Sequence, residues 1–372
     1  MRVYIIELCI ILACMSCSHK QQFLEVCTVD DNLVISGKHM YEYLLTMSGK
    51  ETMFGHQDAG VYGHDWMYIT GKSDIKDVCG AAPAVFGWEL GHLELGDSVS
   101  LDSISFNKIR EGIQYVYSKG GINTISWHLR NPWNNESAWN KTVGTVHAIL
   151  NNDEVGAKYR SWLDKLADFM LSLRNSNNEL IPVLFRPFHE HTGSWFWWGH
   201  DNCTAEDYKS LWRYTVSYLR DEKQVHNLLY IYSPDRVNSL EEYLDRYPGD
   251  EWVDIWGLDL YHRDGSEKAE EYMGFVKNTL AFMKTECETR HKPFVFSETG
   301  LCELTMADWF TNVLYKAITP MYPAYVLVWR NAYNMPQHYY APYPGHPTCP
   351  DFIKFKNQPN ILFLDEITNV YR

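Results

Sequence analysis

The sequence has no cluster of positive charge. Its 372 residues include 33 Lys and Arg against 47 Asp and Glu, which gives a formal net charge of −14, and no long run of Lys or Arg occurs. Proteins that bind a phosphate backbone need clustered Lys and Arg. We therefore expect no nucleic acid partner, and the charge favours a neutral substrate over an anionic one.

The sequence also lacks the spacing of a metal site. The six cysteines beyond the first residues form neither a CxxC pair nor a Cys/His pattern typical of zinc; they are Cys27, Cys79, Cys203, Cys287, Cys302 and Cys349. We expect no metal and no organic cofactor. Some of these cysteines can pair in an exported chain, but their spacing does not say which.

No apolar run near the N-terminus is long enough to cross a bilayer. The segment MRVYIIELCIILACMSCSHK has Arg2 and then an apolar run to about Cys17, interrupted by Glu7. This length is typical of an export signal. ILAC and CMSC resemble bacterial lipoprotein cleavage sites, so we expect a signal at residues 1–17 with Cys14 or Cys17 lipidated. The protein would then lie in a bacterial cell envelope, as a periplasmic or outer-membrane lipoprotein; an ordinary secretory signal is the alternative.

Aromatic residues are abundant. They make up 15% of the chain, with 14 Trp and 25 Tyr. Such an excess is typical of surfaces that stack on flat apolar ligand faces, including sugar rings. A Trp-rich core is the alternative for most individual residues.

Eight strand-like segments alternate with helical ones. They are Thr52–His56, Ala84–Leu90, Ile122–Leu129, Ile181–His189, Leu228–Ser233, Val253–Tyr261, Pro293–Ser297 and Ala324–Trp329. Amphipathic stretches lie between them, most clearly Val155–Arg174. This alternation predicts a parallel sheet, and eight strands predict a closed (β/α)8 TIM barrel. No linker rich in Gly, Ser or Pro divides it, so we expect an N-terminal segment at 18–37 and one domain at 38–372.

Two glutamates follow strand-like segments. Glu190 lies in IPVLFRPFHEHTGSWFWWG and Glu298 in KPFVFSETG, each after an apolar run. In a barrel of parallel strands the C-terminal strand ends surround one cleft, so the two carboxylates can meet there. Paired carboxylates in a cleft are what glycosidic bond hydrolysis requires. The position of the two glutamates at strand ends predicts that residues 38–372 form a catalytic domain.

The predicted strands also end in further residues that hydrogen-bond or stack. These residues are His56, Gln57, Trp88, Glu89, Trp127, His128, Arg186, His189, Ser233, Asp235, Asp259, Tyr261, Trp329, Arg330 and Asn331. A structural role explains any one of them, but a packed barrel rim does not need ionisable groups at every strand end. The Pro/Tyr segment MPQHYYAPYPGHPTCPDF follows the last strand and is either a wall of the cleft or a surface belt.

Six segments together resemble glycoside hydrolase family 26, whose best-known members are β-mannanases. The segments are GHQDAGVYG, SWHLRNP, FRPFHEHTGSWFWWG, GLDLY, FSETG and VWRNAY, in the family's order from about Met53 to the C-terminal region. The family belongs to a retaining clan with the acid/base on strand four and the nucleophile on strand seven. This placement agrees with the strand count above.

The resemblance implies a role for each matching residue. Glu190 would be the general acid/base and Glu298 the nucleophile. His189 would orient the acid/base or contact the sugar, and Trp195 would be the aromatic platform on the leaving-group side. The subsite of the attacked sugar would be lined by His128, Tyr261 and Trp329, with Arg330 contacting the next sugar on the non-reducing side.

A retaining mechanism makes opposite demands on the two carboxyl groups. They must lie about 5–5.5 Å apart, one protonated and one ionised. Aromatic burial and nearby negative charge would raise the pKa of Glu190. Glu298 must stay charged and needs donors such as Tyr261 or Arg186, and Asp259 would be an orienting acceptor.

The resemblance implies a retaining β-1,4-mannanase acting on mannan, glucomannan or galactomannan, or on manno-oligosaccharides. It leaves open whether the enzyme cleaves internally or releases mannobiose. Two alternatives remain. The same barrel would act on another β-glycan, such as β-1,3-xylan or mixed-linkage glucan, or the protein would be a non-catalytic glycan-binding protein. The intact glutamates and histidines speak against the latter.

Overall fold

The computed structural model describes residues 27–263, 265–368 and 370–372. The predicted export signal, with Cys14 and Cys17, lies outside these residues. Within the described part of the chain, no helix combines the length and the apolar character that crossing a membrane requires.

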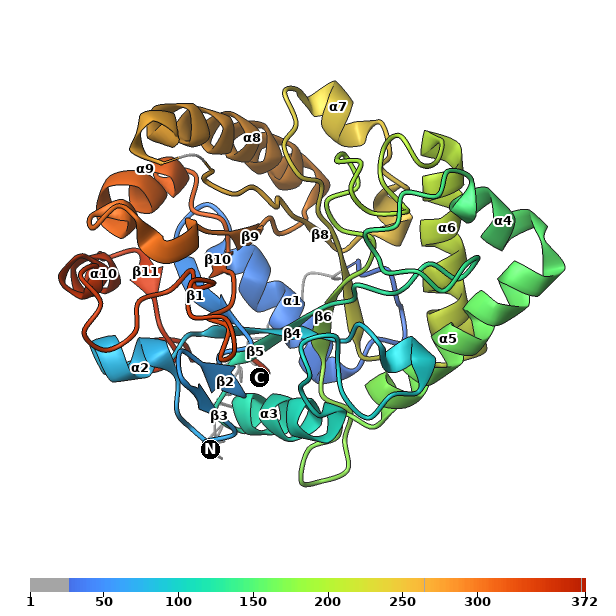
Figure 1. Ribbon diagram of the computed structural model, residues 1–372, viewed down its shortest axis with the longest axis horizontal. Helices are drawn as coiled ribbons and strands as arrows, with labels where there is room; N and C mark the ends of the chain where they lie inside the picture. Colours follow the sequence, from blue (N-terminus) through green and yellow to red (C-terminus); the bar gives the residue numbers. More distant parts are fainter. Residues whose placement is uncertain (1–26, 264, 369) are drawn as a thin grey trace, which may run out of the picture.

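Eight parallel strands form the centre of the molecule (Figure 1). They are β1 (Thr52–Gln57), β4 (Val85–Glu89), β5 (Ile122–Ser126), β6 (Val183–Arg186), β7 (Leu228–Tyr232), β8 (Ile255–Trp256), β9 (Phe296–Thr299) and β10 (Tyr325–Val328). Their order in the sheet is β8-β7-β6-β5-β4-β1-β10-β9. Parallel bridges from Trp256 to Phe294 and from Asp259 to Glu298 join the two ends. The sheet therefore closes, which confirms the predicted (β/α)8 barrel with a single catalytic domain.

Helices surround this barrel (Figure 1). They are α2 (Asp74–Cys79), α3 (Phe106–Ser118), α4 (Thr145–Asn151), α5 (Asp153–Leu171), α6 (Ala205–Ser217), α7 (Leu240–Leu244), α8 (Ala269–Arg290), α9 (Tyr315–Ile318) and α10 (Cys349–Lys356). The amphipathic stretch predicted at Val155–Arg174 corresponds to α5, which buries Tyr159, Leu163 and Leu166. Three short strands lie outside the ring of eight: β2 (Tyr62–Gly63) pairs with β3 (Trp66–Met67), and β11 (Ile361–Leu362) pairs with β1.

Helix α1 (Ile35–Met47) covers the N-terminal end of the barrel. Its buried Met40, Tyr41 and Leu44 join one apolar cluster with residues at the starts of the strands, such as Met53 and Ile122. The chain before α1 is also attached there, because the Val29 N–H donates to Asp254 Oδ1 at 2.8 Å. The loops that follow the strands lie at the opposite end of the barrel, where the strands end. The predicted domain boundary at residue 38 falls inside α1.

Several strands are shorter than predicted, and two of them are shorter by five residues or more. The segment Ile181–His189 is a strand only over β6, because Phe188 and Glu190 have φ of +50° and +53°, which no strand accommodates. The segment Val253–Tyr261 is a strand only over β8, and beyond it single bridges replace continuous pairing. In both places the chain leaves the sheet before polar residues that the sequence singled out, Glu190 after β6 and Asp259 after β8.

Candidate active site

The C-terminal strand ends surround a cleft of about 890 Å³. Glu190, after β6, and Glu298, in β9, both line it. His128, Trp195, Tyr261 and Trp329 line it too; the walls are completed by Trp139, Phe196, His262, Arg263, Gly265, Leu301, Cys302, Thr305 and Tyr340. The structure thus brings the two predicted carboxylates into one cavity with four of the predicted sugar-contacting residues.

Glu190 sits in a turn that hydrogen bonds hold from several sides. Its left-handed φ of +53° is uncommon for a residue with a side chain. Its N–H donates to the Ser233 carbonyl at 2.8 Å. The carbonyl of His189 accepts from Trp198 Nε1 at 2.8 Å, and that of Phe188 accepts from the Tyr208 hydroxyl at 3.0 Å. These contacts fix the direction in which the Glu190 side chain leaves the barrel.

The surroundings of Glu190 favour its protonated form. The residue is buried, and burial, followed by the negative charges of Glu298, Asp235 and Asp259, raises its pKa well above the ordinary value. Trp195 Nε1 donates to Glu190 Oε2 at 2.7 Å, which only partly opposes this effect. The sequence predicted both that the pKa of Glu190 is raised and that burial and negative charge raise it. A carboxyl group with a raised pKa can donate a proton near neutral pH.

Glu298 is surrounded by donors instead. The Tyr261 hydroxyl donates to Glu298 Oε1 at 2.7 Å, and Arg186 Nη2 donates to Glu298 Oε2. Both donors were expected from the sequence, and both are present. Each oxygen of the carboxylate therefore accepts a hydrogen bond, one of them from a charged donor.

Arg186 is held in place by Asp259. Arg186 Nη1 donates to Asp259 Oδ2 at 2.6 Å, and Asp259 also accepts from Ser233 Oγ at 2.9 Å and Ser297 Oγ at 2.7 Å. Burial raises the pKa of Asp259 to about 7, and Arg186 acts in the opposite direction. These contacts direct the second arm of the guanidinium toward Glu298, and the orienting role of Asp259 stays a prediction.

A chain of three side chains supports the wall of the cleft at His128. Glu89 Oε2 lies 2.7 Å from His128 Nδ1, and His128 Nε2 lies 3.1 Å from His189 Nε2. Burial disfavours charge on His128, but Glu89 more than offsets it and the pKa of His128 is raised. Burial, reinforced by Arg186, lowers the pKa of His189 well below its ordinary value. His189 is 1% exposed and contacts His128 rather than the Glu190 carboxylate, so it lies behind the cleft wall.

Arg330 lies outside the cleft as well. It is 8% exposed, with Nη2 at 2.9 Å from Asp102 Oδ1 and Nη1 donating to the Tyr62 hydroxyl at 3.3 Å. Its predicted contact with a second sugar stays a prediction. The neighbours Trp197 and Trp198, left unassigned from the sequence, are fully buried.

Sequence reasoning missed several residues of the cleft. Trp139 is 49% exposed and its ring stacks on His128, with centroids 5.2 Å apart and planes at 12°. Arg263 lies in the loop after β8 and Cys302 begins a short 3-10 helix after β9. No sequence pattern marked either of them or Trp139. Tyr340 belongs to the Pro/Tyr segment, and its N–H donates to Asn331 Oδ1 at 3.0 Å, so part of that segment is a wall of the cleft.

No metal site is apparent among residues 27–263, 265–368 and 370–372, where no group of three or more His, Cys, Asp or Glu is placed to hold an ion. The six cysteines in this part of the chain are free thiols. The expectation that the reaction needs no metal or organic cofactor stays a prediction.

The chain belongs to glycosyl hydrolase family 26, whose model matches residues 29–319. It is similar to the structure of a GH26 β-mannanase from Bacteroides ovatus, with a TM-score of 0.88 and 41% identity over 91% of this chain and 98% of that one. It is 33% identical to a mannan endo-1,4-β-mannosidase of Bifidobacterium adolescentis over 73% of this chain, which spans only 27% of that protein. A mannan endo-1,4-β-mannosidase of Bacillus subtilis is 30% identical, over 74% of each chain.

Proposed function

We propose that this protein is a retaining endo-β-1,4-mannanase. The observation that carries the proposal is the division of roles in the cleft: burial and negative charge keep Glu190 protonated, while Tyr261 and Arg186 donate to Glu298. A retaining glycosidase requires one carboxyl group of each kind. The mannanase names of its relatives support mannan, glucomannan or galactomannan as the substrate.

The reaction follows from these two groups in two steps. In the first, Glu298 attacks the anomeric carbon while Glu190 gives its proton to the glycosidic oxygen, so the C–O bond breaks and the leaving sugar departs neutral. In the second, Glu190, now ionised, takes a proton from water, whose oxygen displaces Glu298 from the same carbon. Two inversions at this carbon retain the β-configuration.

The decisive experiment measures hydrolysis of a panel of β-glycans and follows products over time. We expect the purified protein to cleave mannan and glucomannan and to give β-configured products in proton NMR. Activity confined to β-1,3-xylan or mixed-linkage glucan would reject the substrate, and binding without hydrolysis would reject the enzyme. A ladder of manno-oligosaccharides at early times supports internal cleavage, whereas mannobiose alone would indicate release from chain ends.

We also propose that the protein is an exported lipoprotein of a bacterial cell envelope. The support is Arg2, the apolar run and the segments ILAC and CMSC. Palmitate labelling should appear in the native protein and disappear when Cys14 and Cys17 are both replaced by Ser. Absence of label in the native protein would argue against the anchor but would leave export possible by an ordinary signal.

A further inference from the structure

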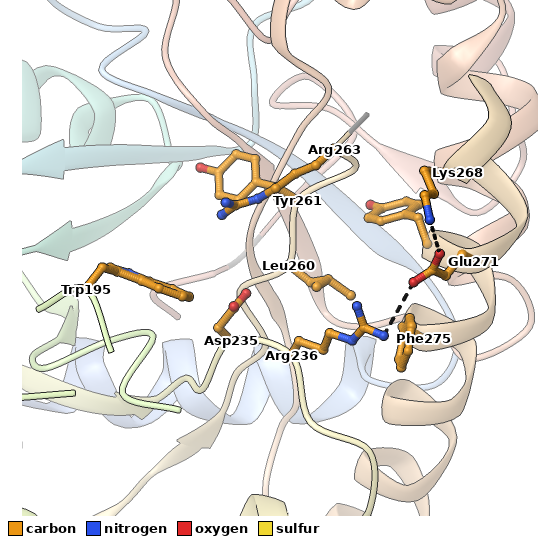
Figure 2. A pocket seen from close by; sticks show the side chains of 10 residues that line it. Trp195, Asp235, Arg236, Leu260, Tyr261, Arg263, Lys268, Glu271 and Phe275 are labelled. Carbon is orange, nitrogen blue, oxygen red and sulfur yellow. Dashed lines mark hydrogen bonds and ion pairs between the residues drawn. The ribbon is translucent and has the colours of Figure 1, made fainter. Parts of the chain in front are cut away.

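A second pocket, of about 420 Å³, adjoins the cleft beside Trp195. It shares Trp195, Tyr261 and Arg263 with the cleft, and it lies between the loops that follow β7 and β8. Figure 2 shows Trp195 at one end of this pocket and α8, with Glu271 and Phe275, at the other. Its size is within the range of about 300–1,000 Å³ that is common for small-ligand sites.

The polar groups at the two ends of this pocket differ. At the α8 end Glu271 is paired, with Arg236 Nη2 at 3.4 Å and Lys268 Nζ at 3.0 Å. Nearer Trp195, Asp235 and Arg263 extend into the pocket (Figure 2), and in the part of the chain that the structure describes neither has a hydrogen bond to another side chain. Asp235 accepts the backbone N–H of Arg236, and the Arg263 guanidinium lies 6.0 Å from the centroid of the Trp195 ring. A carboxylate and a guanidinium placed in this way keep hydrogen-bonding capacity for a ligand with several hydroxyl groups.

The floor and walls of the pocket are partly apolar. Leu260 and Phe275 line it together with the ring of Trp195. The Arg236 guanidinium lies over Phe275, at 3.4 Å from the ring centroid. Apolar surface beside a few free polar groups fits a neutral pyranose, whose C–H faces pack while its hydroxyl groups hydrogen-bond.

The pocket lies on the leaving-group side of the reaction. Trp195 Nε1 contacts the Glu190 carboxyl at 2.7 Å, and a general acid is beside the oxygen of the sugar that leaves. The pocket is therefore next to the first leaving-group sugar. Helix α8 lies across its far end (Figure 2), and its volume of about 420 Å³ suits a branch of one sugar better than a long backbone.

We propose that this pocket takes a single-sugar branch, such as an α-galactosyl unit on the 6-hydroxyl, carried by the first sugar of the leaving group. The proposal rests on the proposed mannanase function. A branch in this pocket would let the enzyme cleave a chain that carries a branch on the first sugar of the leaving group. The released fragments should then carry galactose on the mannose at their non-reducing end.

The test compares defined manno-oligosaccharides with and without such a branch. Glu271→Trp fills the α8 end of the pocket and touches no residue of the catalytic pair. We expect it to lower kcat/KM for the branched substrate about ten-fold or more and to leave the unbranched substrate unchanged. Glu270→Trp is the matched control, because this exposed neighbour on α8 does not line the pocket.

A second variant tests the hydrogen bonds. Arg263→Ala should lower the ratio of branched to unbranched kcat/KM by about ten-fold, the effect of a lost hydrogen bond to a charged group. Using the ratio removes any effect of Arg263 on the cleft itself. An unchanged ratio in both variants, or a native enzyme that leaves every branched site uncut, would overturn the proposal.

The pocket has one competing use, as the site of the second backbone sugar of the leaving group. In that case Glu271→Trp would lower kcat/KM for longer unbranched substrates as much as for branched ones, and the branch proposal would be wrong. A native protein inactive on unbranched mannan would reject the proposed function itself, and the branch proposal with it. The unbranched substrate therefore separates the two failures.

Discussion

At the scale of residues, the partners of the two glutamates differ in kind. Glu298 accepts hydrogen bonds from a guanidinium and a phenol, whereas Glu190 accepts one from an indole and faces three other carboxylates. Burial and these carboxylates raise the pKa of Glu190, whereas both oxygens of Glu298 accept hydrogen bonds. Replacing Glu298 and replacing Glu190 should therefore impair the reaction in different ways.

Glu298→Ala removes the nucleophile, so activity should fall by several orders of magnitude on every substrate. Glu190→Ala keeps the nucleophile but loses the proton donor, and natural substrates should react about 10²–10⁴-fold more slowly. Dinitrophenyl glycosides need little protonation, so this variant should show a burst of dinitrophenol, and azide should restore turnover with a β-configured product.

Stopped-flow absorbance and product NMR check both expectations. If the burst and the azide rescue belong to Glu298→Ala instead, the two roles are reversed. An α-configured product from the native enzyme would show that the mechanism is not retaining.

Asp235→Asn should move the alkaline limb of the kcat/KM profile to lower pH. The charge of Asp235 is among the causes that raise the pKa of Glu190, so its removal lowers that pKa. The acid acts only while protonated, and its activity is lost as pH rises through its pKa. Asp221→Asn, which alters a half-exposed carboxylate paired with Arg220, is the control and should leave the limb in place. A limb unchanged in Asp235→Asn would contradict this electrostatic role.

At the scale of elements, α1 contributes stability rather than chemistry. Leu44 is fully buried against the starts of the strands, so Leu44→Ala should lower the free energy of unfolding by about 2–5 kcal/mol. KM should not change, because α1 is far from the strand ends. Urea unfolding followed by Trp fluorescence measures the effect, with the exposed Thr46→Ala as the control. An equal loss in both variants would mean that α1 does not depend on this packing.

The eight strands were predictable because most of them lie in segments rich in apolar residues between polar ones. The turn that carries Glu190 was not, because its left-handed residues depend on hydrogen bonds from Trp198 and Tyr208, which follow the strand. The place of His189 depends likewise on a contact with His128 across 61 residues. Strand identity is thus local information, whereas the ends of strands and the direction of side chains are set by tertiary contacts.

At the scale of the whole molecule, we predict that the chemistry requires only side chains of the chain itself. We expect full activity after extensive dialysis against EDTA, because two carboxyl groups suffice for both steps. Activity on mannan before and after dialysis, with dialysis against buffer as the control, measures this. A loss that one divalent cation restores would contradict the expectation.

The position of α1 has a consequence for how an anchored molecule would face its surroundings. The chain enters the barrel at the end that α1 covers, and the cleft opens at the other end. A lipid on Cys14 or Cys17 would therefore tether the enzyme by its closed end. Because the described chain begins at the end of the barrel opposite the mouth of the cleft, such a tether would not join the barrel beside the cleft.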